Sequence, residues 1–238
     1  MLVNLEHRSD ESELMDDPFV EEKALKIALS DISRVNKLLG GNSITVKAVA
    51  KLINDANLDK ELVLLDLGCG DGEMLRVIAD ICRKKNIKIK LVGVDLNDKS
   101  LEIAKDLSIP YPEIEYYKKD ILHIDRSELA CDIIICTLTL HHLNCNEIKE
   151  VIKKTLELAS LGIIINDLQR SKIAYYLFRL FSFFFIKGYI AKNDGLVSIK
   201  RGFKKQELLS YAKDLKLQQY QIDWKWAFRY RWIIKTKY

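Results

Sequence analysis

Two helical patterns open the chain. Between Asp17 and Leu39 apolar residues recur every three or four positions, which is the period of an amphipathic helix. Asp17 suits the cap of this helix, with Pro18 at the first helical position, and Gly40-Gly41 ends it. A second, shorter helix is predicted from Ser43 to Asp55.

From Glu61 onward, short apolar runs alternate with amphipathic stretches. The apolar runs predict strands at Leu62–Leu67, Ile89–Val94, Ile114–Tyr117, Ile133–Cys136 and Gly162–Asn166. The stretches between and after them predict helices at Gly72–Lys85, Lys99–Leu107, Asn146–Ser160 and Lys204–Leu215. Two last strand-like stretches, Gln218–Trp226 and Arg229–Lys235, are spaced to pair as a hairpin. Because alternating strands and helices form a parallel sheet covered on both faces, we expect a doubly wound α/β fold.

This pattern divides the chain into two parts. Residues 1–58 are expected to form an N-terminal helical cap, and residues 59–238 the main α/β domain. Within the main domain, residues 168–200 interrupt the alternation and are interpreted as a helical insertion placed like a lid.

Composition and charge are those of an ordinary globular protein. Apolar residues make up 48% and charged residues 30%, and a net charge of +4 is too small to indicate nucleic acid or an anionic membrane. The five cysteines have no framework spacing and predict reduced thiols in the cytoplasm. The N-terminus lacks the apolar stretch of a signal peptide. The apolar segment Ile173–Ile190 is interrupted by Arg179 and Lys187, so its charge-free run is far below the ~20 residues of a membrane span. No stable membrane insertion is therefore expected, and nothing indicates the oligomeric state.

A glycine-rich turn follows the first predicted strand. It reads Asp66-Leu67-Gly68-Cys69-Gly70-Asp71-Gly72, and glycines at such a turn let a ligand approach the backbone closely. A dinucleotide loop would carry its third glycine one residue later, where Glu73 stands. The carboxylates of Asp66, Asp71 and Glu73 would also repel a pyrophosphate. S-adenosylmethionine has no phosphate and carries two cationic groups, so an acidic glycine turn suits it.

Two further acids follow the next two strands. Asp95 ends the second strand, where a carboxylate can accept hydrogen bonds from both ribose hydroxyls. Asp120 follows the third strand, where it could accept one from an adenine amino group. Open α/β sheets bind their ligands at these carboxyl ends. Each acid could instead serve only as a turn or helix cap, an alternative that is stronger for Asp120.

At this point the sequence resembles the class I S-adenosylmethionine-dependent methyltransferases, and more narrowly their small-molecule branch near the ubiquinone and menaquinone enzymes. The resemblance runs from about Leu62 to Asp167 and adds Cys136–Leu143 as the family's fourth motif. It implies a Rossmann-like, seven-stranded and mostly parallel sheet with an antiparallel last strand. It also implies that S-adenosylmethionine is bound, and its product S-adenosylhomocysteine released, by Asp66, Gly68, Gly70, Asp71, Gly72, Asp95, Leu96, Asp120, Ile121 and Thr137.

The fourth motif brings two histidines to the mouth of the expected site. A base is needed only if the acceptor must lose a proton, and neutral imidazole suits that task near neutral pH. His142, ahead of His141, is the candidate catalytic residue, with a structural role for the pair as the alternative. A zinc site built from Cys131, Cys136, Cys145 and these histidines lacks ligand spacing, so no metal is expected.

The fourth motif and the insertion indicate the chemical class of the methyl acceptor. Thr137-Leu138-Thr139-Leu140 is not the Asn/Asp-Pro-Pro-aromatic tetrad that usually accompanies methylation of nucleobases or glutamine, so no nucleic acid partner is expected. The insertion is rich in Tyr and Phe, which suits a flat hydrophobic acceptor, although a lid helix that contacts no ligand is the alternative. Tyr175, Tyr176, Arg170 and Arg201 are the candidate substrate residues.

These observations favour O-methylation of a small hydroxylated aromatic or polyketide-like acceptor. C-methylation of a quinone precursor and a cofactor-binding protein without turnover are the alternatives. A lipid-surface protein anchored by the aromatic insertion and an RNA-binding C-terminal stretch are less favoured by the pattern.

Overall fold

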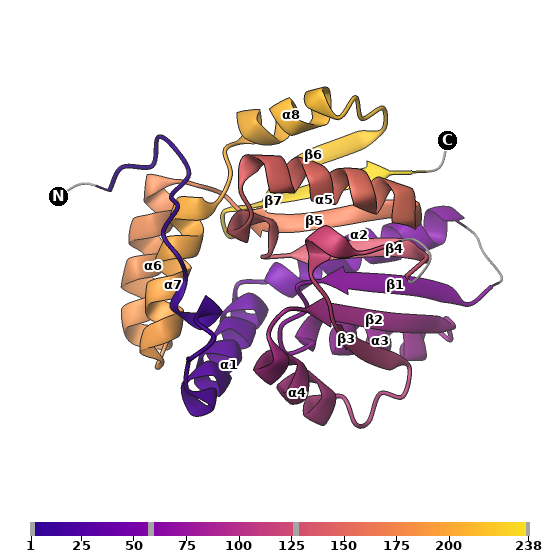
Figure 1. Cartoon of the computed structure of the whole chain (residues 1–238), viewed down its shortest axis with the longest axis horizontal. Helices are drawn as coiled ribbons and strands as arrows, with labels where there is room; N and C mark the ends of the chain where they lie inside the picture. Colours follow the sequence, from indigo (N-terminus) through magenta and orange to yellow (C-terminus); the bar gives the residue numbers. More distant parts are fainter. Residues whose placement is uncertain (1–2, 57–59, 126–128, 237–238) are drawn as a thin grey trace.

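One seven-stranded sheet forms the centre of the molecule. The computed structural model describes residues 3–56, 60–125 and 129–236. The strand order is β3-β2-β1-β4-β5-β7-β6, and β7 runs antiparallel to both of its neighbours (Figure 1). The strands are β1 (Leu62–Leu67), β2 (Ile89–Asp95), β3 (Ile114–Lys118), β4 (Cys131–Thr137), β5 (Ala159–Leu168), β6 (Tyr220–Lys225) and β7 (Arg229–Lys235). The predicted doubly wound fold with an antiparallel last strand is confirmed.

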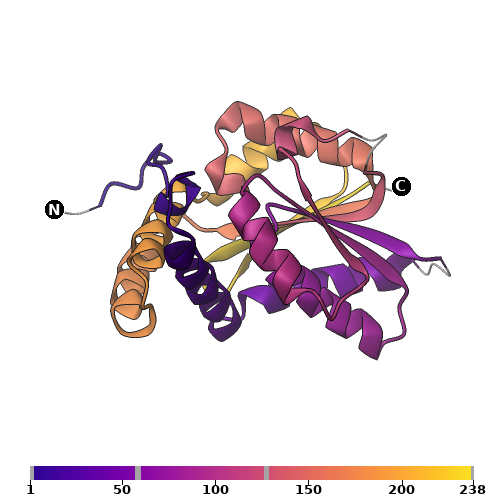
Figure 2. The ribbon, with the colours of Figure 1, turned by 60° about the horizontal axis from the view of Figure 1, so that its bottom comes forward.

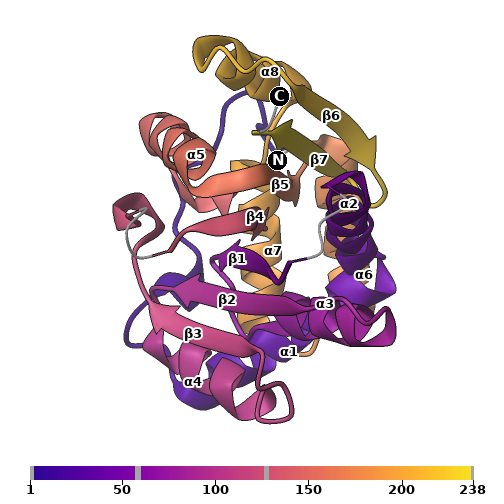
Figure 3. The ribbon, with the colours of Figure 1, turned by 90° about the vertical axis from the view of Figure 1, so that its right-hand side faces the viewer.

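Helices cover both faces of this sheet. On one face lie α2 (Gly41–Ala56), α3 (Glu73–Lys84) and α4 (Asp98–Leu107), and on the other α5 (Cys145–Leu158) and α8 (Lys205–Asp214); Figure 3 shows α2 and α5 on opposite sides. Successive strand residues alternate between the two layers: Leu64 packs with α2 and α3, whereas Leu65 packs with α5 and α8. Both faces of the central strands are therefore buried, as their continuous apolar runs predict.

Three further helices stand beyond the carboxyl ends of the strands. They are α1 (Glu22–Leu38), α6 (Lys172–Phe185) and α7 (Tyr189–Arg201), which lie side by side at the left in Figures 1 and 2. Ala28 of α1 packs with Ile190 of α7 in a small core of their own. At Gly195 of α7 an added Cβ would lie 2.2 Å from the ring of Phe178 of α6, so this glycine permits the close contact of the two helices.

The N-terminal region differs from the sequence-based expectation in two ways. Asp17 does not cap α1, which begins at Glu22; it ends the short 3-10 helix η1 (Leu14–Asp16), and its Oδ1 accepts a hydrogen bond from the Phe19 amide. A carboxylate just before a proline satisfies a tight turn as well as a helix start, which explains the error. Moreover, α2 packs on the sheet with the core. The expected domain boundary between residues 58 and 59 lies outside the described residues, so the division stays a prediction.

The described ranges contain no helix whose length and hydropathy would allow it to cross a membrane.

Trp232 of β7 tests the packing of the sheet on α5 and α8. Its side chain is fully buried, and its Nε1 has no hydrogen-bond partner among the described residues. Trp232→Ala should lower the free energy of unfolding by about 3–5 kcal/mol because it leaves a large cavity. Trp232→Phe should cost clearly less, because it fills most of that space and removes an unpaired N–H. Urea denaturation of both variants measures the difference, and equal losses would contradict this account of the core.

Candidate functional site

A cavity of about 1230 Å³ lies between the carboxyl ends of the strands and helices α1, α6 and α7. Its walls come from the ends of β1, β2 and β4, from the N-terminal segment, and from one face of α6. Pockets for one drug-sized ligand measure about 300–1,000 Å³. This cavity is therefore large enough for two ligands side by side.

The turn after β1 brings its backbone to the cavity wall. Gly68 and Gly70 have φ of +69° and +54°, a region that side chains disfavour, and both line the cavity. A Cβ on Gly68 would lie 2.5 Å from Thr139, so glycine lets the turns after β1 and β4 touch. Gly72 has no part in the cavity wall: a Cβ there would lie 2.0 Å from the Tyr116 hydroxyl. Its expected place among the cofactor residues stays a prediction, and the absence of a side chain lets Tyr116 pack against the start of α3.

Asp66 and Asp95 place two carboxylates at this wall. Asp66 is only 2% exposed, and burial, aided by the charge of Asp95, holds the pKa of its carboxyl well above the usual range. Burial also raises the pKa of Asp95, although hydrogen bonds from backbone amides, including those of Asn97 and Gly70, oppose it. Buried carboxylates of this kind favour a cationic ligand, because a nearby positive charge restores the ionised form.

The ends of β2 and β3 shape the next part of the wall. Leu96, at 59% exposure, and Ile121 offer apolar surface to the cavity. Asp120 also lines it, but its Oδ1 accepts from the Leu122 amide and its Oδ2 lies 2.9 Å from His123 Nδ1. Asp120 therefore caps the short helix η2 (Ile121–His123), as the alternative interpretation held, while remaining at the wall. Asp71 lines the cavity as well and accepts hydrogen bonds from Ser33 and from the Glu73 amide.

The segment after β4 is held in an unusual conformation. Leu138 has φ of +56°, which costs a side-chain-bearing residue about 1–3 kcal/mol and is typical of functional sites. Thr137 meets Thr45 of α2 at 3.2 Å between hydroxyls, and Thr139 donates to the carbonyl of Leu67. The short helix η3 (Leu140–His142) follows and carries the histidine pair.

His141 is locked between two carboxylates. It is 2% exposed, its Nδ1 lies 2.8 Å from Asp167 Oδ1, and its Nε2 lies 3.3 Å from Glu13 Oε1 without hydrogen-bond geometry. Burial lowers the pKa of His141, but Asp167 and Glu13 outweigh it and raise the pKa to about 9. In the absence of another cation this imidazole is charged at neutral pH, so it is poorly suited to act as a free base.

His142 is the more accessible member of the pair. Its side chain is 26% exposed and lines the cavity. Its Nδ1 lies 3.1 Å from Asp16 Oδ2, and its Nε2 lies 3.8 Å from Glu13 Oε2. Both candidate histidines line the cavity, but His142 is the one whose side chain is more exposed to it.

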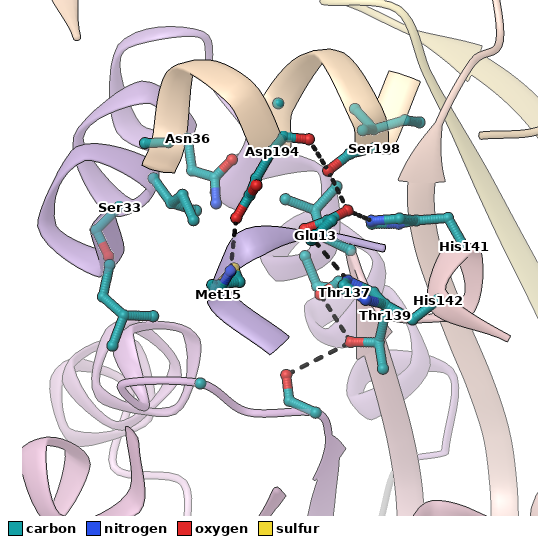
Figure 4. A pocket seen from close by; sticks show the side chains of 18 of the residues that line it. Glu13, Met15, Ser33, Asn36, Thr137, Thr139, His141, His142, Asp194 and Ser198 are labelled. Carbon is teal, nitrogen blue, oxygen red and sulfur yellow. Dashed lines mark hydrogen bonds and ion pairs between the residues drawn. The ribbon is translucent and has the colours of Figure 1, made fainter. Parts of the chain in front are cut away.

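Glu13 is the functional residue that sequence reasoning missed. It is 4% exposed, and the Ser198 hydroxyl of α7 donates to its Oε1 at 2.6 Å (Figure 4). Although burial raises the pKa of Glu13, its contacts with His141, His142 and Ser198 lower it overall. Asp194 of α7 fixes the same segment by accepting from the Leu14 and Met15 amides. No periodicity distinguishes Glu13 from the other acids of the N-terminus, so the sequence carried no signal for it.

The structure does not bring the two tyrosines expected to contact substrate to this cavity, so their role stays a prediction. Tyr175 and Tyr176 have no part in the cavity wall; Tyr176 is 38% exposed, and its hydroxyl accepts from the Val3 amide. The wall is instead formed by the helix face that carries Ala174, Leu177, Phe178, Phe181 and Phe184. These positions follow the three- and four-residue spacing of one helix face, a signal that was present in the sequence.

The two expected substrate arginines are structural. Arg170 is buried in a two-pronged ion pair with Glu207 and donates to the carbonyls of Leu5 and Glu6. Arg201 donates to the carbonyls of His141 and His142. Both arginines thus hold the N-terminal segment and η3 from outside the cavity. Arg229 of β7 does line the cavity; burial lowers its pKa to about 10, and it donates to Asn36 of α1.

Comparison with known proteins finds methyltransferases that are similar to this chain. Residues 64–160 match the family model described as "Methyltransferase domain". This part of the chain is therefore similar to methyltransferase domains. The acidic wall at Asp66 and Asp95 would suit the two positive charges of S-adenosylmethionine.

Solved methyltransferases share the fold of most of the chain. The plantazolicin methyltransferase BpumL in complex with SAH superimposes with a TM-score of 0.68 at 15% identity, covering 91% of this chain and 96% of that one. Magnesium protoporphyrin IX methyltransferase (ChlM) from Synechocystis PCC 6803 gives 0.56 at 16% identity, covering 86% and 84%. These likenesses support the fold.

A probable ribosomal RNA small subunit methyltransferase A of Methanococcus aeolicus is 35% identical over 105 residues. The match spans 43% of this chain and 36% of that protein's length.

Asp66 is expected to lower the stability of the ligand-free protein and to strengthen cofactor binding. With a raised pKa in the folded state, Asp66 lowers stability as pH rises above the ordinary aspartate range, because only the unfolded chain then releases this proton freely. Asp66→Asn should therefore raise the melting temperature of the ligand-free protein at neutral pH, with a smaller gain in acid. The same variant should weaken S-adenosylhomocysteine binding by about 1.5–3 kcal/mol, the worth of a hydrogen bond to a charged group.

Scanning calorimetry and titration calorimetry measure these two effects. Asp106→Asn, an exposed aspartate of α4, is the matched control and should change neither. A variant at Asp66 that loses stability and keeps its affinity would show that this carboxylate serves the fold alone.

Proposed function

We propose that this chain methylates a small hydrophobic acceptor that carries a hydroxyl group. S-adenosylmethionine would supply the methyl group from its sulfonium. Asp66 and the Gly68–Gly70 turn would hold its amino-acid end, Asp95 its ribose hydroxyls, and Leu96, Asp120 and Ile121 its adenine, since all of them line one continuous wall. Asp71 and Thr137, two further candidate cofactor residues, line the same cavity.

The cavity beyond the cofactor wall is the observation that carries this proposal. There, Leu177, Phe178, Phe181 and Phe184 of α6 face Leu29 and Ile32 of α1. A broad apolar space between two helices suits a flat, hydrophobic acceptor, because burial of apolar surface yields about 25 cal/mol per Å². The polar groups at its margin, among them Asn36 and Arg229, suit an acceptor with a few oxygens.

O-methylation is favoured over the alternatives by the histidine cluster. An acceptor hydroxyl must lose a proton, and His142 is the more exposed of the two histidines that line the cavity, whereas His141 is buried between Asp167 and Glu13. C-methylation of a quinone precursor, as in the ubiquinone-type branch, is the second candidate. It needs the same cavity but a carbon nucleophile. The five free cysteines support a reducing, cytoplasmic location.

We propose no nucleic acid substrate, despite the partial match to an RNA methyltransferase. The residues after β4 are Thr137-Leu138-Thr139-Leu140, without the amide and aromatic groups that would grip a planar amine.

Transfer of a labelled methyl group tests the proposal. The purified chain is incubated with methyl-labelled S-adenosylmethionine and matched sets of hydrophobic phenols, quinols, carboxylic acids, amines and RNA. We expect label in phenols or quinols, and the position of the new methyl by NMR distinguishes O- from C-methylation. S-adenosylhomocysteine binding without transfer to any set, or transfer to RNA alone, would contradict the proposal.

Two adjacent phenylalanines of α6 provide a matched pair for the acceptor cavity. Phe183 and Phe184 are 73% and 68% exposed and contact each other edge to face, but only Phe184 lines the cavity. Phe184→Ala should raise the KM for the acceptor about 10-fold or more, because a lost aromatic contact costs about 1.5–3 kcal/mol. Phe183→Ala should leave KM within about 2-fold, since surface substitutions cost less than about 0.5 kcal/mol. Steady-state kinetics measures both, and equal effects would place the acceptor elsewhere.

His142→Ala tests the proton step. Its turnover number at neutral pH should fall by about 10²–10⁴-fold, the usual worth of a positioned group that assists proton removal. Affinity for S-adenosylhomocysteine should stay unchanged, and raising the pH should restore part of the rate, because the acceptor hydroxyl then ionises unaided. His7→Ala, an exposed histidine of the N-terminal segment, is the control. Full activity of His142→Ala would mean that positioning alone suffices.

A further inference from the structure

The cluster formed by Glu13, His141 and His142 has a geometry that hydrogen bonds alone do not explain. Both imidazole Nε2 atoms converge on one carboxylate, at 3.3 Å from Oε1 and 3.8 Å from Oε2 (Figure 4). The buried His141 Nε2 makes no hydrogen bond among the described residues, and 3.8 Å is too long for one at His142. The ligand atoms of all three residues lie within 4.8 Å of one another.

The opposite ring nitrogens of both histidines are fixed by other carboxylates. His141 Nδ1 meets Asp167 and His142 Nδ1 meets Asp16. A ring that donates its Nδ1–H to a carboxylate presents the lone pair of Nε2 on its other side, which is the usual arrangement of a metal-binding histidine. An unprotonated Nε2 would face the oxygens of Glu13 with a lone pair, and this contact becomes favourable when either a proton or a metal ion lies between them.

We propose that Glu13, His141 and His142 bind a divalent transition-metal ion of the zinc or cobalt type at the wall of the cavity. Two imidazoles and one carboxylate form a common ligand set for such ions, which keep an open position for water or substrate. Bonds of 2.0–2.2 Å place neighbouring ligands about 3.0–3.5 Å apart, close to the separations seen here. This proposal departs from the sequence-based expectation of no metal, because Glu13 comes from a segment far from the histidines in the chain.

The surrounding charges favour a divalent cation. Three carboxylates, those of Glu13, Asp16 and Asp167, face the two imidazoles. The guanidinium groups of Arg8 and Arg201 approach from the other side, where they donate to the carbonyls of His141 and His142 rather than to the carboxylates. Binding of the ion releases any proton held at Nε2 of the histidines to solvent.

The role of the ion rests on the proposed function. Because all three ligands line the cavity, an open coordination position could take an acceptor hydroxyl from it; the pKa of that hydroxyl would fall, and its proton would leave to solvent. The acceptor oxygen then forms a bond to the methyl carbon while the carbon–sulfur bond breaks, its electron pair remaining on sulfur. His142 would thus act through the ion and not as a free base.

Cobalt binding tests the site apart from any turnover. The full chain, without a histidine tag and stripped with a chelator, is titrated with Co²⁺ alone, followed by visible absorption and calorimetry. We expect one Co²⁺ per chain, and at least 10-fold weaker binding in Glu13→Gln and in His142→Ala. Asp16→Asn should weaken binding about 10-fold, as loss of a carboxylate behind a ligating histidine does. His7→Ala should bind like the wild type, and circular dichroism checks that each variant folds.

Absence of saturable Co²⁺ and Zn²⁺ binding by the wild type would overturn the proposal, as would equal affinity in the ligand variants and the His7→Ala control. Titration with S-adenosylhomocysteine on the same samples separates the two proposals. Cofactor binding without metal binding removes the metal site alone. Metal binding without methyl transfer to any acceptor removes the proposed function alone.

Discussion

The contact on which the rest of the site depends is the buried pairing of Glu13 with His141. It joins the N-terminal segment to the loop after β4, and Ser198 of α7 and Asp167 of β5 extend it on either side. Four parts of the chain therefore meet at one cluster of charge. Removing a single partner would leave a buried charge uncompensated, which is far more costly than the pairing is stabilising. The closure of the cavity by α7 and the N-terminal segment is thus coupled to the electrostatics of the site itself.

At the wall that carries Asp66, the protein does not balance the negative charge of the carboxylate. Asp66 is buried without a cation, and its raised pKa records an unfavourable interaction in the ligand-free domain. The strained backbone at Leu138 adds a second cost a few residues from the same wall. Natural binding sites commonly store such costs, because a ligand that relieves them binds more tightly. The charges around Glu13 and His141 are therefore paired within the protein, whereas the carboxylate of Asp66 would be paired by the cofactor.

The sheet could be predicted closely from the sequence, because strands buried on both faces must be continuous apolar runs. The bounds of β1 follow from such a run, and the positions of Asp66, Asp95 and Asp120 at the carboxyl ends of β1, β2 and β3 follow from the fold. The acceptor side could be predicted only in part. Its aromatic content was evident, but the face of α6 that meets the cavity depends on how that helix docks, and Tyr175 and Tyr176 point elsewhere. Glu13 could not be predicted at all, since its burial arises from a tertiary contact across more than 120 residues.

The aromatic side chains of α6 follow from the position of that helix. A helix that packs on a sheet needs one apolar face, but α6 meets α7 with Phe178 and turns Phe184 to the cavity. Apolar residues on more than one face are therefore required here, and several stay exposed, among them Leu180 and Phe183. Helices α6 and α7 pack closely on each other, through Phe178 and Gly195. The acceptor side of the cavity therefore depends on contacts between helices, whereas the proposed cofactor wall is built on the strand ends.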